Sequence, residues 1–221
     1  MSPASPFAAM VCGAIAAVAL SALVVPGNAW PASDDAFQSA WQSFARASAG
    51  DDSAIDTAVA AFEALHKAEP ANPVVMAYAG ASIALQARTA LAPLQKMSLA
   101  EDGLARIDSA LATLTSAHDA PIERGTPGSL EVRFVAANTF LAVPSFMNRA
   151  ARGKKLLNEV LASPLFEKTP LPFQGSVWLR AAELAAKEQR TDDARQYLHE
   201  IVSRNAPQAS RARDLLKAPA P

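Results

Sequence analysis

The chain has 221 residues, of which 51% are hydrophobic and 19% charged, and its formal net charge is -1. That apolar share can form a sizeable core and excludes bulk disorder, and the balanced charge provides no basic field for nucleic acid. The 51 alanines, with 16 prolines mostly between apolar-periodic stretches, predict an all-α protein. One cysteine, Cys12, excludes a disulfide framework and a cysteine-based zinc site.

The first thirty residues have the pattern of an export signal. Residues 7–25 carry no charge, Pro26 interrupts the run, and the small residues Gly27 and Ala29 suit a signal-peptidase site. This predicts that residues 1–29 are a signal peptide cleaved near Ala29, and that the protein is periplasmic or secreted. No Lys or Arg precedes the run, and 19 apolar residues could just span a bilayer, so an uncleaved inner-membrane anchor stays open.

After this segment, apolar residues recur at helical spacing between turn-forming residues. The third predicted helix starts at Pro73 and is kinked or broken by Pro93, and Ser98 to Glu101 has the form of a capping box for the fourth. No alternating run indicates a strand. The predicted helices are 34–49, a stretch capped at 51–53 that ends by Pro70, 73–91, 98–114, 129–143, 145–162, 174–189, 191–205 and 208–217.

The spacing inside these helices resembles the tetratricopeptide repeat. The second predicted helix has Ala58, Phe62, Leu65 and Pro70 at the family's small, aromatic, apolar and proline positions. Related matches recur along the chain, at Trp41-x2-Phe44-Ala45, Gly103-x3-Ile107-x2-Ala110, Gly153-x3-Leu157-x2-Val160, Trp178-x2-Ala181-Ala182 and Ala194-x3-Leu198-x2-Ile201. The resemblance implies a TPR-like α-solenoid over 30–217, with about four antiparallel helix hairpins, a C-terminal capping helix and a disordered tail at 218–221.

In tetratricopeptide proteins the first helix of each hairpin lines a concave groove. By resemblance, Ala77, Ala81 and Leu85 would face it from the second hairpin, and Leu179, Glu183 and Lys187 from the fourth. The family's clamp for C-terminal carboxylates needs an asparagine where this chain has Ala81 and Glu183, so that binding mode is not expected. The resemblance implies a protein or peptide partner.

Residue patterns for catalysis and cofactors are missing from the sequence. The histidines His66, His118 and His199 do not pair at zinc-ligand spacing, and no G-x-S-x-G or Walker motif is present. The acidic pairs fall at predicted helix starts, where capping explains them. A non-enzymatic protein without metal or cofactor is therefore expected.

Two surface features are candidates for partner binding. Arg149, Arg152 and Lys155, with Lys154 beside them, form a basic stripe on one helix, which is either a solvated face or a docking patch for an acidic partner. Aromatic residues flank the proline-rich stretch 163–173, where they either pack in the core or line a pocket: Phe146, Phe166, Phe173 and Trp178.

Three hypotheses for function follow. The first is an exported scaffold or adaptor that binds a protein or peptide, with cell-envelope or transporter components as possible partners and no role for nucleic acid. The second is a periplasmic accessory protein of a membrane transporter, holding a small molecule at 163–178. The third is an interaction module anchored to the membrane by an uncleaved N-terminal segment.

Overall fold

The computed structural model describes residues 34–122 and 124–217, and within them the regular structure is helical, without strands. The predicted all-α class is confirmed. The predicted signal peptide and the tail at 218–221 lie outside the described residues. The α-helices are α1 (Asp34–Ser48), α2 (Ile55–Ala68), α3 (Pro73–Gln86), α4 (Pro93–Ala112), α5 (Gly128–Ala142), α6 (Ala150–Leu161), α7 (Leu171–Lys187), α8 (Thr191–Ser203) and α9 (Ala209–Lys217).

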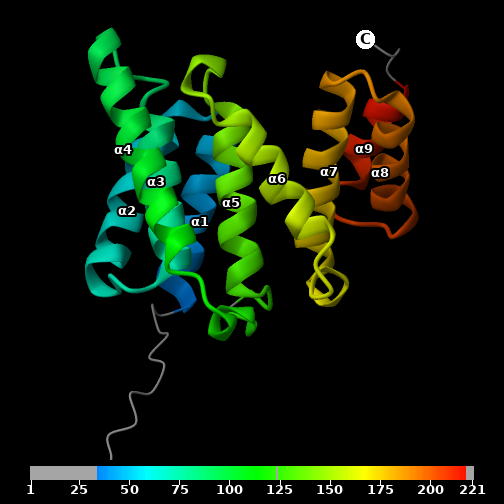
Figure 1. The fold of residues 1–221 in the computed structure, drawn as a ribbon, viewed down its shortest axis with the longest axis horizontal. Helices are drawn as coiled ribbons and strands as arrows, with labels where there is room; N and C mark the ends of the chain where they lie inside the picture. The colour runs from blue at the N-terminus through cyan, green and yellow to red at the C-terminus, as the bar shows by residue number, and fades with distance from the viewer. Residues whose placement is uncertain (1–33, 123, 218–221) are drawn as a thin grey trace, which may run out of the picture. The chain divides into compact units, whose positions relative to one another are not determined.

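Helices that follow one another in the sequence pack together in pairs. The most extensive contacts join α3 to α4, α7 to α8 and α5 to α6, and α1 packs against α2 (Figure 1). Between pairs, α2 packs against α3 about as extensively as against α1, both α3 and α4 contact α5, and α6 contacts α7, while α9 packs against α8. Within each pair the connection is short, and short connections make neighbouring helices antiparallel.

Three helix starts differ from the sequence prediction by three residues or more, and proline explains two of them. Pro93 opens α4 instead of breaking a helix, because Ala92 before it is extended and proline is well suited to the first turn. The expected cap Ser98 therefore lies inside α4, where its hydroxyl donates to Asp102. Similarly, α7 begins at Leu171, with a proline in its first turn. The sixth helix starts later than predicted, because Asn148 takes a left-handed conformation at φ 54°.

Close approach of the helices depends on small residues. A Cβ atom added to Gly80 would lie 2.7 Å from the carbonyl oxygen of Gly103, and one added to Gly103 would lie 2.5 Å from that of Gly80. The two glycines therefore bring α3 and α4 into backbone contact. Ile107 lies against Gly80 at this crossing and, like Phe62 and Phe140 elsewhere in the core, is among the largest fully buried side chains.

In the part of the chain that the structure describes, no helix combines the length and apolar character needed to cross a bilayer.

Candidate binding groove

A groove of about 1070 Å³ runs along the odd-numbered helices. Helices α1, α3, α5, α7 and α9 all contribute to its lining, together with the first two turns of α4 and the α5–α6 connection. Even-numbered helices otherwise stay out of the lining. The lining of the groove includes Trp41, Tyr78, Ala81, Leu85, Arg88, Lys96, Met97, Phe134, Asn138, Ala142, Phe146, Leu179, Arg180, Glu183 and Arg211.

Large apolar side chains stand exposed in the groove lining and on the chain beside it. Met97 on α4 and Phe146 in the α5–α6 connection both line it, and Phe146 is 66% exposed. Next to Met97, Leu94 is 84% exposed and Leu91 is 95% exposed. Figure 1 shows the reason, since the first turns of α4 project beyond the helices beside them. The rim of the groove is therefore apolar and uncovered by the described residues.

Charged side chains line the groove. On the α7–α9 wall, Glu183 accepts from Arg211 at 2.6 Å and pairs with Arg180 at 3.5 Å. Arg180 also donates to the Asn138 carbonyl oxygen at 3.3 Å. Its Nε is buried without an acceptor among the described residues. One carboxylate thus faces two guanidinium groups, and the wall keeps a positive charge.

The α3–α4 side of the groove carries two more cations, one of which is paired. Arg88, at the end of α3, donates to Asp52 at 2.7 Å and to the Ala47 carbonyl oxygen at 2.7 Å, which ties α3 to the α1–α2 connection. Lys96, on the exposed start of α4, has no ion-pair partner within the described residues. Among the described lining residues, Glu183 is the carboxylate and Arg88, Lys96, Arg180 and Arg211 are the cations.

Below the groove floor lies a buried charged cluster. Glu131 on α5 is 1% exposed. It pairs with Arg124 and accepts from the Tyr78 hydroxyl at 2.5 Å. The Arg124 guanidinium stacks 4.6 Å from the Trp41 ring centroid, and Trp41 and Tyr78 both line the groove. This cluster joins α1, α3, α5 and the preceding loop, so it fixes the relative positions of three groove-lining helices.

Burial raises the pKa of Tyr78 above its ordinary value of 10.0, because the interior disfavours the phenolate; nearby Arg124 opposes this shift. As pH rises, the Tyr78 hydroxyl ionises in the unfolded chain before it ionises in the folded protein. The stabilisation due to Tyr78 is therefore lost between pH 10.0 and its folded-state pKa.

Because the chain has two tyrosines, ultraviolet titration of a Tyr197→Phe variant reports Tyr78 alone. In the folded protein we expect the Tyr78 phenolate to form at a pH above the ordinary tyrosine pKa of 10.0, and in denaturant we expect it to form at that pKa. Titration at the ordinary value in folded protein would contradict burial of the hydroxyl.

The structure brings only some of the predicted groove residues together. Leu179 and Glu183 line the groove from α7, as do Ala81 and Leu85 from α3. Lys187 is exposed at the end of α7 and lies outside the lining. Ala77 is fully buried in the core. The sequence interpretation missed Arg180, Arg211, Lys96 and Met97, because their position depends on how separate helices approach one another.

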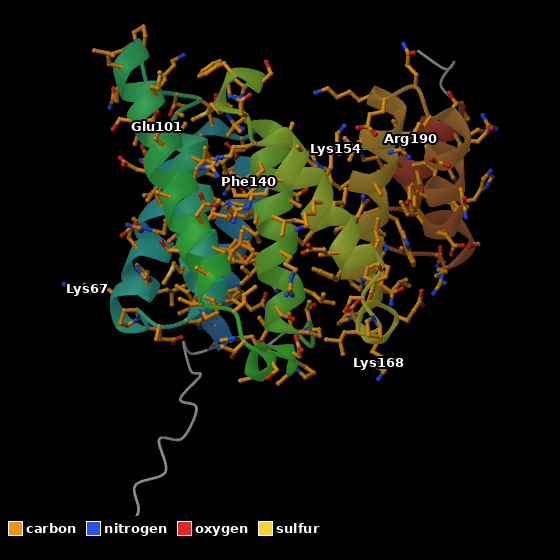
Figure 2. All side chains as sticks on the ribbon, in the orientation of Figure 1. Lys67, Glu101, Phe140, Lys154, Lys168 and Arg190 are labelled. Carbon is orange, nitrogen blue, oxygen red and sulfur yellow. The ribbon has the colours of Figure 1, made fainter. Side chains whose placement is uncertain are left out.

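The basic stripe on α6 lies away from this groove and takes part in internal contacts. Arg149 and Arg152 both pair with Asp108 on α4, at 2.9 and 2.5 Å. Each guanidinium also lies 5.3 Å from the ring centroid of Phe140, which is labelled in Figure 2. Two members of the stripe therefore hold α6 against α4 and α5.

The lysines of the same helix have different surroundings. Lys155 is 77% exposed and lies 3.8 Å from Glu159 on its own helix. Lys154, also labelled in Figure 2, pairs with Glu188 at the end of α7. This contact and that with Arg190 lower the pKa of the Glu188 carboxyl. A docking role for the stripe stays a prediction, and Lys155 is its most accessible member.

Most aromatic residues around 163–173 pack in the core. Phe166 and Trp178 are buried and meet edge to face at 5.6 Å between ring centroids, while Phe173 packs against Phe134 on α5. Phe146 is the exception, and it belongs to the groove described above. The aromatic side chains of 163–178 thus join α5 and α7.

A second hollow of about 730 Å³ lies between α2, α3 and α4. Its lining includes His66 and the ion pair of Glu63 with Arg106. Burial, followed by the charge of Arg106, lowers the pKa of His66. Within residues 34–122 and 124–217, no group of three or more histidine, cysteine, aspartate or glutamate side chains is placed to hold a metal ion.

Comparison with known proteins gives no match to this chain among family models, curated proteins or solved structures. The interpretation of the groove therefore depends on the residues that form it.

Proposed function

We propose that this protein is a non-enzymatic, exported adaptor that binds a protein or peptide partner in the groove along α1, α3, α5, α7 and α9. In this proposal the paired helices form a TPR-like solenoid of four hairpins, with α9 as its capping helix. Export depends on the N-terminal pattern of residues 1–29, which lies outside the described residues.

The observation that carries the proposal is the composition of the groove lining. The first helix of every pair contributes to it, as in a tetratricopeptide groove, and α9 completes one wall. Exposed aromatic and methionine side chains at its rim, Phe146 and Met97, are of the types enriched at protein interfaces. Arginines on the wall are also enriched among residues that dominate binding energy.

The proposal predicts that filling the groove weakens partner binding. Ala142 is exposed at the end of α5 and lines the groove, so Ala142→Trp adds an indole there without disturbing the core. We expect affinity capture from solubilised cell envelope with the tagged full-length protein to recover a specific protein. The tryptophan variant should lose at least about tenfold of that binding, since one blocked contact site costs 1.4 kcal/mol or more.

Ala151→Trp is the matched control, because Ala151 is exposed on α6 and lies outside the groove lining. Lys155→Glu tests the basic stripe without breaking the Asp108 ion pairs. Equal capture by the Ala142→Trp variant and the native protein would exclude the groove as the binding site. Loss of capture in the Lys155→Glu variant but not in the Ala142→Trp variant would place the binding site on α6.

A further inference from the structure

The groove continues onto an apolar surface that no described residue covers. We call this surface the rim strip and define it by Leu91, Leu94, Met97 and Phe146. Folded proteins rarely gather large exposed apolar side chains at one place unless something binds there. Met97 and Phe146 also line the groove, and Leu94 lies one turn before Met97 on α4, so the rim strip adjoins the groove.

The charges beside this surface favour a negatively charged occupant. Arg180 and Arg211 share the single carboxylate of Glu183, so cations outnumber carboxylates on this wall. The Lys96 ammonium stands on the exposed start of α4, between Leu94 and Met97 of the rim strip. Complementary charge fixes the orientation of a partner and speeds its association.

Occupants that the chain itself could supply do not match this charge. A second copy that inserted its rim strip would bring its own Lys96 toward Arg180 and Arg211, and like charges oppose such a contact. The apolar N-terminal segment 1–33 contains no aspartate or glutamate. A flat lipid surface could reach Leu91 and Leu94, but not the recessed Arg180, whose side chain is 26% exposed.

We propose that the groove and rim strip recognise a segment of another protein in which large apolar side chains alternate with acidic ones. This inference rests on the proposed groove-binding function and specifies its ligand. The apolar side chains pack on Met97, Phe146 and the rest of the rim strip. The carboxylates accept charge-assisted hydrogen bonds from Arg180 and Arg211 on the α7–α9 wall and from Lys96 at the start of α4.

Selection of a random peptide library displayed on phage against the full-length protein tests this proposal. We expect the enriched peptides to combine Leu, Met or Phe with Asp or Glu. Fluorescence anisotropy of one enriched peptide should show about tenfold weaker binding for Arg211→Glu and for Lys96→Glu, because a hydrogen bond to a charged group contributes about that much. Added salt should weaken binding of the native protein in the same direction.

Two charge reversals serve as matched controls. Arg213 lies exposed on α9, the same helix as Arg211, but outside the groove lining, so Arg213→Glu should leave peptide affinity unchanged. Lys67, labelled in Figure 2, is exposed at the end of α2, and Lys67→Glu should likewise have no effect.

The outcomes separate this inference from the proposed function. Enriched peptides without acidic residues, still blocked by Ala142→Trp, would overturn the acidic ligand and leave groove binding intact. Peptides that bind Ala142→Trp as well as native protein, or no enrichment at all, would overturn both. If the protein floats with anionic lipid vesicles and Leu94→Asp abolishes that flotation, the rim strip binds a membrane and the inference is overturned. If the protein sediments as a dimer and Leu94→Asp abolishes the dimer, the rim strip binds a second copy of the chain and the inference is likewise overturned.

Discussion

Replacing Glu131 with alanine should lower the free energy of unfolding by about 3–5 kcal/mol, the usual cost of removing one partner of a buried ion pair. Glu131 is 1% exposed and binds both Arg124 and the Tyr78 hydroxyl. Without the carboxylate, the Arg124 charge stays beneath Trp41 with no counter-charge. Chemical denaturation followed by far-ultraviolet circular dichroism measures this loss.

Two comparisons separate the contribution of the buried Glu131–Arg124 pair from the general effect of removing a carboxylate from a helix. Glu159→Ala removes a half-exposed carboxylate that lies 3.7 Å from Arg133 and 3.8 Å from Lys155, and should cost at most about 1 kcal/mol. The double variant Glu131→Ala/Arg124→Ala should lose less than the two single variants together, since neither charge is left alone. A loss below about 1 kcal/mol for Glu131→Ala would contradict a buried charged cluster.

The second large effect is expected at the crossing of α3 and α4. Gly103→Ala would place a Cβ atom 2.5 Å from the Gly80 carbonyl oxygen and 2.7 Å from the Ala84 backbone nitrogen. Relief of these backbone contacts requires the helices to move apart, at a cost of about 3 kcal/mol. Alanine recovers about 1 kcal/mol through its higher helix propensity. The net loss of unfolding free energy should be about 2 kcal/mol, measured by the same denaturation experiment.

Gly128→Ala is the control for this substitution. A Cβ at Gly128 meets its nearest atoms at 3.4 Å, which is ordinary van der Waals contact, so its stability should change by less than about 1 kcal/mol. Equal stability of the Gly103→Ala and native proteins would show that α3 and α4 are not held in backbone contact.

Much of the helical pattern could be predicted because it depends on neighbouring residues. Helical spacing of apolar residues predicted α1 to within one residue, Asn72 caps α3 through hydrogen bonds to Val74 and Val75, and Asp51 caps the short 3-10 helix that precedes α2. Asp51 accepts from Ser53 and Arg46, and these hydrogen bonds lower its pKa. Proline was harder to interpret, because Pro93 can end one helix or open the next, and the conformation of Ala92 decides between them.

The candidate site was less predictable, because residues from five odd-numbered helices and α4 meet there. Leu179 and Glu183 could be placed by analogy with a repeat, and both line the groove. Arg211 could not, since its contact with Glu183 spans 28 residues of chain. The basic stripe shows the opposite error. Arg149 and Arg152 are regularly spaced along α6, but Asp108 on another helix determines where their guanidinium groups lie.

The amino-acid sequence by itself therefore determined which stretches become helices and which small residues lie between them, because propensity, capping and apolar spacing act over a few residues. Only the tertiary structure decided which charges are paired and which face the groove. It also left Leu91, Leu94 and Lys96 exposed at the start of α4. An ion pair or a binding surface forms between helices, so its residues are identified only once the helices have packed.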